Sequence, residues 1–357
     1  MSLLSSSRFS VPRLPALAAA AALMASQALG SAAAFAQSDP IADFYKGKNI
    51  TMLVGFSTGN GADSYARLFA RHLGRFIPGN PSVVVQNMPG SGSLVMANYL
   101  YSVAPKDGSV IGVFNRNVPM EPLMGNKNAR FDARKFTWIG SANTEPSLCV
   151  AWGASPIKTW EDTKTREWVI AATGLNANSG LVPTLLNKVL GTKMKMIMGY
   201  PGASEMSLAM ESGEVEGRCG WSRSSLMATK SQWVTEKKVN LLIQAGLQKN
   251  PALMDVPLAM DFVTSERDKS LLKLAVAWDE MAWPFMAPPD VPAARRDTLR
   301  RAFAAAIKDP QLVAEAEREK LDLTLVTGES IEQLLADIYA TPEDIVAEMR
   351  AIITPPK

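Results

Sequence analysis

The sequence predicts an α/β protein of two lobes, built on mixed, mostly parallel sheets and followed by a helical C-terminal segment. Three observations support this fold class. From residue 48 onward, β-rich runs alternate with helical patterns, which is the order of elements in α/β proteins. The alternation occurs twice, over residues 50–114 and again over residues 148–244. After a proline-rich stretch at residues 283–289, a run of helical patterns follows.

The first unit begins with a predicted strand at residues 50–54 and a helix at residues 63–76. The helix is expected because its apolar residues fall on one face: Tyr65, Leu68, Phe69, Leu73 and Phe76. A strand at residues 83–85, a helix at residues 94–103 and a strand at residues 110–114 complete this unit.

The second unit and the tail contain the remaining predicted elements. Strands are expected at residues 148–152, 168–172, 195–198 and 241–244, and tail helices at residues 292–307, 310–320, 330–339 and 342–352. We expect the chain to cross between the lobes near residues 138–143 and 277–286. Lobe 1 is therefore predicted to comprise residues 37–142 plus 278–357, and lobe 2 residues 143–277.

The N-terminal segment has the features of a cleavable signal peptide. A weakly basic stretch ends at Arg13, an apolar run covers residues 14–29, and small residues end at Ala36. The apolar run is short for a bilayer span, so we expect residues 1–36 to be removed and the remainder to be exported. Export permits a disulfide between Cys149 and Cys219; the alternative is two buried free thiols.

Composition argues against several functions. Without the two leader arginines, the chain has 35 of its 37 basic residues and 34 acidic ones. Its charge is therefore nearly balanced, and no basic surface for binding nucleic acid is expected. One histidine, His72, and two cysteines cannot supply a four-ligand zinc site or an iron–sulfur cluster. No nucleophile motif accompanies His72, and Ser64 breaks a dinucleotide fingerprint. We expect no catalytic residue, no metal and no cofactor.

Two Gly-rich loops, residues 55–63 and 87–93, each follow a predicted strand and lead into a helix. Backbone N–H groups at such a position favour an anion, so a pair of these loops would suit a carboxylate. The alternative for each loop is an ordinary tight connection, and Asp63 is as suited to holding the loop shape as to contacting a ligand. The candidate residues are Ser57, Thr58, Gly59, Asn60, Gly61, Ala62, Asp63, Gly90, Ser91, Gly92 and Ser93.

Other candidates lie further along the chain. Arg116 follows a strand end and is a possible clamp for an acidic ligand. In the second lobe, Asn176, Asn178 and Ser179 occupy a loop that either closes over the ligand or forms a polar surface turn. Tyr200 and Trp221 also follow strands; either aromatic side chain is a possible cleft wall, and packing between the lobes is the alternative for Trp221.

Several motifs, in order, resemble the periplasmic solute-binding proteins of tripartite tricarboxylate transporters, the Bug family. The loop at residues 55–63 with Ala66-Arg67-Leu68 is similar to the family's P-F-x-x-G-G-x-x-D followed by A-R-L. Residues 84–93 resemble V-V-x-N-x-P-G-x-G-G, and residues 105–109 resemble P-D-G-x-T. Three family motifs are matched later in the chain. Residues 200–202 match Y-x-G, residues 213–216 match G-x-V-D, and residues 287–292 match A-P-x-x-x-P. Asn60 and Ser93 replace glycines of the family pattern.

The resemblance implies a type II periplasmic-binding-protein fold, a Venus-flytrap whose lobes close on a small carboxylate. It implies that the first-lobe loop backbones hold one carboxylate and that residues 176–179 complete the pocket. It also implies a periplasmic location and two integral membrane transporter subunits as partners, with a monomer expected because the ligand must be handed over. The alternatives are a ligand-sensing subunit that docks on a signalling receptor and an exported hydrolase.

Overall fold

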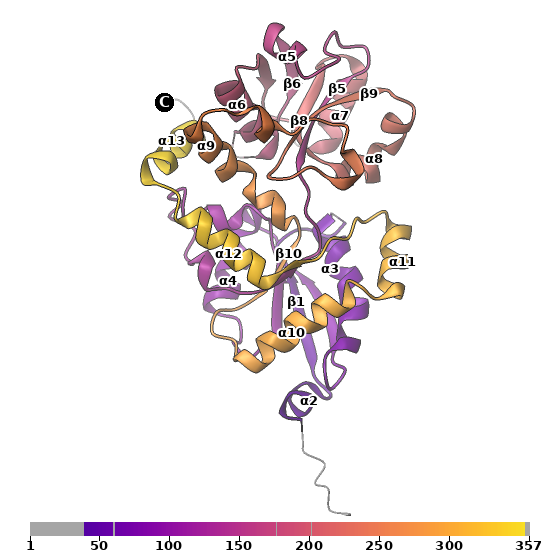
Figure 1. The fold of residues 1–357 in the computed structure, drawn as a ribbon. Helices are drawn as coiled ribbons and strands as arrows, with labels where there is room; N and C mark the ends of the chain where they lie inside the picture. The colour runs from indigo at the N-terminus through magenta and orange to yellow at the C-terminus, as the bar shows by residue number, and fades with distance from the viewer. Residues whose placement is uncertain (1–38, 60, 176, 201, 354–357) are drawn as a thin grey trace, which may run out of the picture.

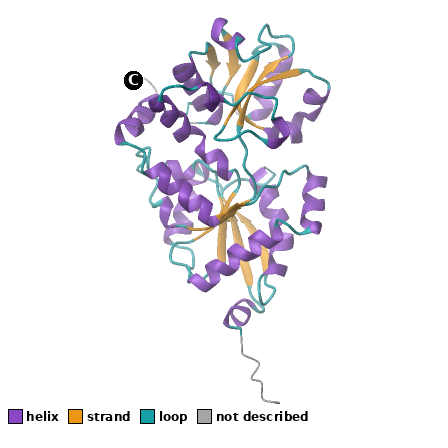
Figure 2. Ribbon diagram, in the orientation of Figure 1, coloured by secondary structure: helices purple, strands orange, loops and turns teal. Residues whose placement is uncertain are grey.

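The computed structural model describes residues 39–59, 61–175, 177–200 and 202–353 (Figure 1). The predicted signal peptide, Asn60 and Asn176 lie outside these ranges. The described chain forms two sheets, and each is covered by helices on both faces, as Figure 2 shows. We call the part built around the six-stranded sheet lobe 1 and the part built around the five-stranded sheet lobe 2. The predicted two-lobed α/β fold is confirmed.

The lobe 1 sheet has the strand order β11-β4-β10-β3-β1-β2. Strand β1 pairs in parallel with β2 and β3, because helices carry the chain back between these strands. Strand β10 is antiparallel to β3 and β4, and β11 is antiparallel to β4. The bounds are β1 (Asn49–Val54), β2 (Ser82–Asn87), β3 (Val110–Val113), β4 (Thr137–Ser141), β10 (Pro284–Ala287) and β11 (Val326–Thr327).

Helices bury both faces of the lobe 1 sheet. Apolar side chains of α3, α10 and α11 form one core with Ile50 and Met52 of β1, and α4 and α12 contribute to the core on the other face. The stacked rings of Phe69 and Phe303 join α3 to α10 at 4.6 Å between ring centroids. The bounds are α2 (Pro40–Tyr45), α3 (Gly61–His72), α4 (Leu94–Ser102), α10 (Ala293–Ala306), α11 (Pro310–Glu319) and α12 (Gly328–Tyr339).

The lobe 2 sheet has the strand order β7-β6-β8-β5-β9. Strand β6 is parallel to β7 and β8, and β5 is antiparallel to β8 and β9. The strands are β5 (Ser147–Trp152), β6 (Trp168–Ala171), β7 (Met194–Ile197), β8 (Gly217–Ser222) and β9 (Val239–Ala245). The helices are α5 (Asp162–Thr165), α6 (Asn178–Leu190), α7 (Ala203–Ser212), α8 (Arg223–Thr235) and α9 (Glu266–Val276).

A disulfide joins the two central strands of lobe 2. Cys149 on β5 and Cys219 on β8 are bonded, with their Cα atoms 3.9 Å apart. Both side chains are fully buried. Of the two alternatives for these cysteines, the bonded one is therefore present.

Two chain segments pass between the sheets side by side. Residues 142–146 lead from β4 to β5, and the 3₁₀ helix Ala277–Met281 leads back to β10. Backbone hydrogen bonds join them: Ala142 N to Trp283 O at 3.1 Å, Ala282 N to Asn143 O at 3.0 Å, and Glu145 N to Asp279 O at 2.8 Å. The predicted crossing at residues 138–143 began too early, because Thr137–Ser141 is strand β4.

The last helix, α13 (Glu343–Ile353), brings the tail back to lobe 2. It packs near α9 (Figure 1), and Lys188 Nζ on α6 lies 2.7 Å from Glu348 Oε1. Its Arg350 Nη2 also donates to Leu123 O in lobe 1, at 2.8 Å. Helix α13 therefore contacts both lobes.

Candidate functional site

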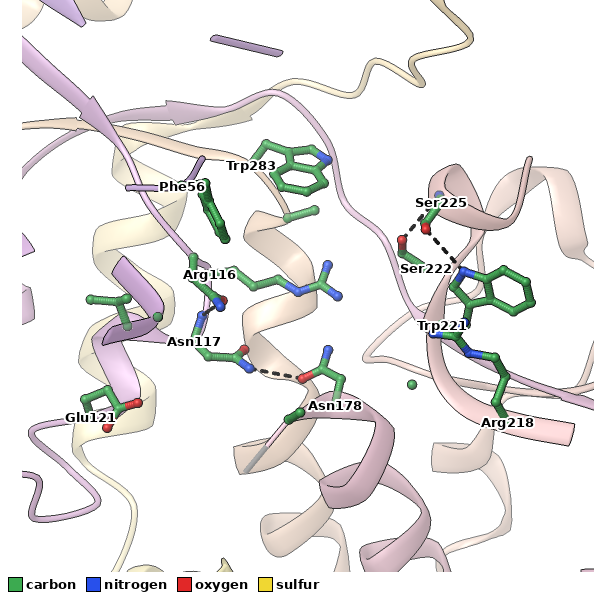
Figure 3. A pocket seen from close by; sticks show the side chains of 16 residues that line it. Phe56, Arg116, Asn117, Glu121, Asn178, Arg218, Trp221, Ser222, Ser225 and Trp283 are labelled. Atoms are coloured by element: carbon green, nitrogen blue, oxygen red, sulfur yellow. Dashed lines mark hydrogen bonds between the residues drawn. The ribbon is translucent and has the colours of Figure 1, made fainter. Parts of the chain in front are cut away.

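A cleft of about 540 Å³ lies between the lobes. Figure 3 shows side chains of both lobes pointing toward it. From lobe 1 and the crossing segment come Phe56, Gly92, Asn115, Arg116, Asn117, Val118, Glu121, Ala282 and Trp283. From lobe 2 come Ala177, Asn178, Arg218, Gly220, Trp221, Ser222 and Ser225.

The loop between β2 and α4 reaches the cleft through Gly92. Ser91, Gly92 and Ser93 have φ angles of 45°, 63° and 81°, so three successive residues are left-handed. This turn brings the backbone of Gly92 to the cleft, and a Cβ built on Gly92 would meet no atom within 4 Å. Gly90 and Ser91 are not among the lining residues of the cleft.

The Ser93 side chain faces inward and joins three strand ends. Its buried hydroxyl donates to Gly55 O, after β1, at 2.8 Å. The same oxygen accepts from Asn115 N, after β3, at 3.2 Å. Ser93 therefore fixes the three lobe 1 loops relative to one another from beneath the cleft surface.

Asp63, on the first turn of α3, holds the loop after β1. Its Oδ2 accepts from Gly59 N and from Arg67 Nε, both at 2.9 Å, and its Oδ1 accepts from Asn87 Nδ2 at 3.0 Å. Burial acts to raise the pKa of Asp63, but the hydrogen bonds from Arg67, Gly59 and Asn87 together leave that pKa below its ordinary value. Of the two roles expected for Asp63, loop support is the one seen.

The rest of the first loop contributes little surface to the cleft. Ser57, Thr58 and Gly59 are exposed and are not among the lining residues, which include their neighbour Phe56. Ala62 is buried in the lobe 1 core. Gly61 lies against Trp283, because a Cβ on Gly61 would be 2.9 Å from two ring carbons of that indole.

Arg116, after β3, points into the cleft (Figure 3). Its Nε lies 3.1 Å from Oδ1 of Asp279, a side chain that is only 4% exposed. Asp279 Oδ2 accepts from Ser147 N at 3.2 Å and from Ser147 Oγ at 3.0 Å. Burial raises the pKa of Asp279 to about 6, against the opposing effects of Arg116 and Ser147. The crossing segment thus orients the Arg116 guanidinium in the cleft.

Two asparagines bridge the cleft from one lobe to the other. Asn117 Nδ2 donates to Asn178 Oδ1 at 3.0 Å, as drawn in Figure 3. Asn178 Nδ2 in turn is 3.4 Å from Ser147 Oγ. The neighbouring Ser179 is buried and its Oγ accepts from Thr173 N at 3.1 Å, so it supports the loop rather than lining the cleft.

The lobe 2 wall is built mainly from β8. Trp221 lines the cleft and donates from Nε1 to Ser225 Oγ at 3.2 Å. Arg218, three residues earlier, lies beneath it with the guanidinium carbon 4.1 Å from the ring centroid. Gly220 allows the close approach of lobe 2's own α6 loop, since its φ is 68° and a Cβ there would be 2.2 Å from the Asn178 carbonyl.

Tyr200, predicted as a possible wall, lies elsewhere. It follows β7, the edge strand furthest from β5 and β9 in the lobe 2 sheet. Its hydroxyl donates to Glu214 Oε1 at 2.5 Å, and burial together with Glu214 raises its pKa to about 12. Tyr200 is not among the lining residues of the cleft.

Several lining residues were missed by sequence reasoning. Asn117 adjoins Arg116 after a strand end, and that position alone signals a place at the cleft. Arg218 sits inside a strand, where a charged residue ordinarily faces solvent, so only the nearby glycines, Gly217 and Gly220, indicated a special position. Trp283 depends on where the crossing segment returns to lobe 1, which no local pattern reveals.

The described residues contain no cluster of three or more His, Cys, Asp or Glu side chains suited to a metal ion. None of their helices is both long and apolar enough to cross a bilayer. His72 is buried, its Nε2 contacts Glu315 on α11, and it does not line the cleft.

Two α/β lobes around a shared cleft are the fold of the periplasmic binding proteins. A TctC solute-binding protein from Polaromonas has this fold, with a TM-score of 0.66 at 19% identity over 87% of this chain and 99% of that chain. A Rhodopseudomonas palustris protein solved with adipate has a TM-score of 0.62 at 15% identity, over 85% and 98% of the two chains.

The family follows from the sequence match. Residues 67–350 match TctC, the tripartite tricarboxylate transporter family receptor, so the chain belongs to this family of solute-binding proteins. A UPF0065 protein of Agrobacterium vitis is 26% identical over 278 residues, which is 76% of this chain and 75% of that protein. The resemblance to the Bug family noted in the sequence is confirmed.

Proposed function

We propose that the mature protein captures a small carboxylate in the cleft between its lobes and delivers it to the membrane subunits of a tripartite tricarboxylate transporter. The observation that carries this proposal is Arg116, a guanidinium oriented by Asp279 and directed into a cleft lined by both lobes. The amides of Asn117 and Asn178 and the Gly92 backbone lie around the same space. The adipate in the R. palustris relative supports the ligand class.

In this proposal one carboxylate group binds between Arg116 and the Gly92 turn. A guanidinium donates two parallel hydrogen bonds to a carboxylate, and left-handed turns present successive backbone N–H groups to an anion. Asp279 holds Nε of Arg116, which leaves the terminal nitrogens directed at the cleft. Ser57, Thr58 and Gly59 act on the ligand only through water or through lobe movement.

The proposed movement is closure about the paired crossing segments. We place the lobe boundaries at residues 142/143 and 277/278, next to the hydrogen bonds that join those segments. Helix α13 contacts both lobes, so it is expected to shift with closure. The Asn117–Asn178 hydrogen bond belongs to the closed arrangement.

Binding rather than catalysis is proposed for the cleft. The lining serines, Ser222 and Ser225, hydrogen-bond with each other and with Trp221, while His72 contacts Glu315 on α11 and does not line the cleft. A nucleophile with an oriented base is therefore not assembled among the described lining residues. We propose that the exported protein acts in the periplasm as a monomer and that two integral subunits receive the ligand.

A thermal-shift screen of residues 37–357 tests the proposal. The panel contains mono-, di- and tricarboxylates, with sugars and amines as controls. We expect the melting temperature to rise with the concentration of one class of acid, as mass action requires, and Arg116→Gln to abolish the rise. A flat response to every acid, from a protein that unfolds cooperatively, would contradict carboxylate binding.

A further inference from the structure

Arg218 is a buried cation without a carboxylate partner in the described part of the chain. It is 4% exposed. Nη1 donates to Ala203 O at 3.2 Å, whereas Nε is buried with no hydrogen-bond partner there. The ion pairs among the described residues include Arg116 with Asp279 but none that involves Arg218. The small surface that Arg218 retains opens on the cleft.

This arrangement is costly for the ligand-free protein. A buried charge is stable when it is paired and its donors are satisfied, and Arg218 has neither a paired charge nor a full set of acceptors. Burial lowers the pKa of Arg218 to about 9, which leaves the guanidinium protonated at neutral pH. An anion in the cleft would supply the missing opposite charge.

The neighbours of Arg218 hold it in position for such an anion. Trp221 covers one face of the guanidinium at 4.1 Å from the ring centroid. The indole is itself fixed by the hydrogen bond to Ser225 and by an edge contact with Trp233 at 6.1 Å. The disulfide at Cys219 fixes the strand at the adjacent residue. A planar group held in one orientation loses little entropy when it binds a carboxylate.

We propose that Arg218 is the specificity residue of lobe 2 and binds a second carboxylate, so that the cleft selects dicarboxylates over monocarboxylates. This inference rests on the proposed function, in which Arg116 of lobe 1 binds the first carboxylate. The carbon chain of the diacid would then lie across the cleft against Phe56, Trp221 and Trp283. Glu121, the acidic residue among the lining residues, accepts from Asn126 Nδ2 at 2.7 Å and does not pair with either arginine in the described structure.

The test compares linear diacids of four to six carbons with their monomethyl esters, by calorimetry on residues 37–357. The ester keeps the chain and one carboxylate and removes the second charge. We expect the unmodified protein to bind its preferred diacid at least tenfold more tightly than the ester. Arg218→Gln should lower the affinity for the diacid at least tenfold and change the affinity for the ester by less than twofold.

Arg166→Gln is the matched control. Arg166 is an exposed arginine of lobe 2 that does not line the cleft, so its loss removes the same charge at a distance. We expect it to change neither affinity. An equal effect of Arg166→Gln and Arg218→Gln would show a long-range charge effect and overturn the proposal.

The remaining outcomes separate this inference from the proposed function. Equal binding of diacid and ester would refute the role of Arg218 while leaving carboxylate capture intact. Equal losses of both ligands in Arg218→Gln, with a lowered melting temperature of the ligand-free variant, would assign Arg218 a structural role. Binding of no acid by the unmodified protein would overturn both proposals.

We expect the ligand-free Arg218→Gln variant to melt at or above the melting temperature of the unmodified protein, since an unpaired buried charge is removed.

Discussion

The two walls of the cleft differ in how they are held in place. In lobe 1, hydrogen bonds hold the loops: Asp63 is bonded to Arg67 and Asn87, and Arg116 is paired with Asp279. Asp63 and the Nε atom of Arg116 therefore have partners within the protein before a ligand arrives. Such a wall is preorganised, and binding there requires little rearrangement.

In lobe 2 a covalent bond holds the wall. The disulfide between Cys149 and Cys219 fixes β8 to β5, and the residue beside it, Arg218, is buried without a carboxylate partner among the described residues. Lobe 1 therefore offers a preorganised site to the ligand, whereas in lobe 2 the ligand itself would supply the charge that Arg218 lacks. Five predictions test this contrast.

The lobe 1 turn should be the most sensitive part of the site. In Gly92→Val the side chain would enter the cleft at a φ of 63°, so we expect at least a hundredfold loss of carboxylate affinity, measured by calorimetry. Gly213→Val is the control, because Gly213 has a φ of 77° and equally open surroundings but caps α7 away from the cleft. Unchanged affinity in Gly92→Val would exclude the turn from the site.

Gly61→Val tests the neighbouring loop through a different contact. A Cβ on Gly61 would be 2.9 Å from the Trp283 ring, which is stacked on Tyr65 at 5.3 Å. We expect the indole to shift and the affinity to fall, by less than in Gly92→Val. A larger loss for Gly61→Val than for Gly92→Val would place the main anion contact on the first loop.

Removal of the disulfide should weaken lobe 2. The bond closes a loop with a sequence separation of 70 residues. The double variant Cys149→Ser and Cys219→Ser should lose about 2–4 kcal/mol of unfolding free energy, measured by urea denaturation. If lobe 2 depends on this bond as described, the preference for diacids should also decline. A stable double variant with unchanged ligand preference would show that packing alone holds β8.

Asp63→Asn should loosen lobe 1 to a smaller extent. The substitution replaces a charged side chain that accepts hydrogen bonds from Gly59, Arg67 and Asn87. We therefore expect the free energy of unfolding to fall by about 1–2 kcal/mol at neutral pH. Because the pKa of Asp63 is lowered in the folded protein, its stabilisation is present above the unfolded pKa and is lost as the pH falls through the folded value. Urea denaturation at pH 7 and pH 3 should show a smaller difference between variant and unmodified protein at pH 3. An equal difference in unfolding free energy at both pH values would contradict a stabilising role for the ionised Asp63 side chain.

Asp279 should show the opposite pH dependence. Its pKa is raised to about 6, so between roughly pH 4 and 6 the folded protein binds more protons than the unfolded chain. Its contribution to stability therefore falls as the pH rises through this range. Asp279→Asn should flatten the slope of unfolding free energy between pH 7 and 5. An unaltered slope would assign the pH dependence to other groups.

Much of the fold was predictable because its signals are local. The strand at residues 50–54 and the helix at residues 63–76 correspond to β1 and to α3 with the 3₁₀ turn after it. The four tail helices were also predicted within two residues at each end. Strand β4 was not predicted because its strand-favouring run, Thr137 to Ile139, is short and is followed by Gly140 and Ser141; pairing with β10 and β11 completes it.

The site was less predictable because its residues meet only through the arrangement of the lobes. Arg116, Gly92, Asn178 and Trp221 were expected near a ligand and do line one cleft. Ser93 and Ser179 occupy the expected loops, but their hydroxyls bond to the protein backbone instead of facing the cleft. The direction of a short side chain in a loop depends on left-handed residues such as Ser93, which sequence patterns do not reveal.

The most direct test is a crystal structure of residues 37–357 with the acid that raises the melting temperature most. We predict one carboxylate within about 2.7–3.2 Å of a terminal nitrogen of Arg116 and of the Gly92 turn, with its chain directed toward Arg218. An acid bound outside the cleft, or within it but without contact to Arg116, would contradict the account.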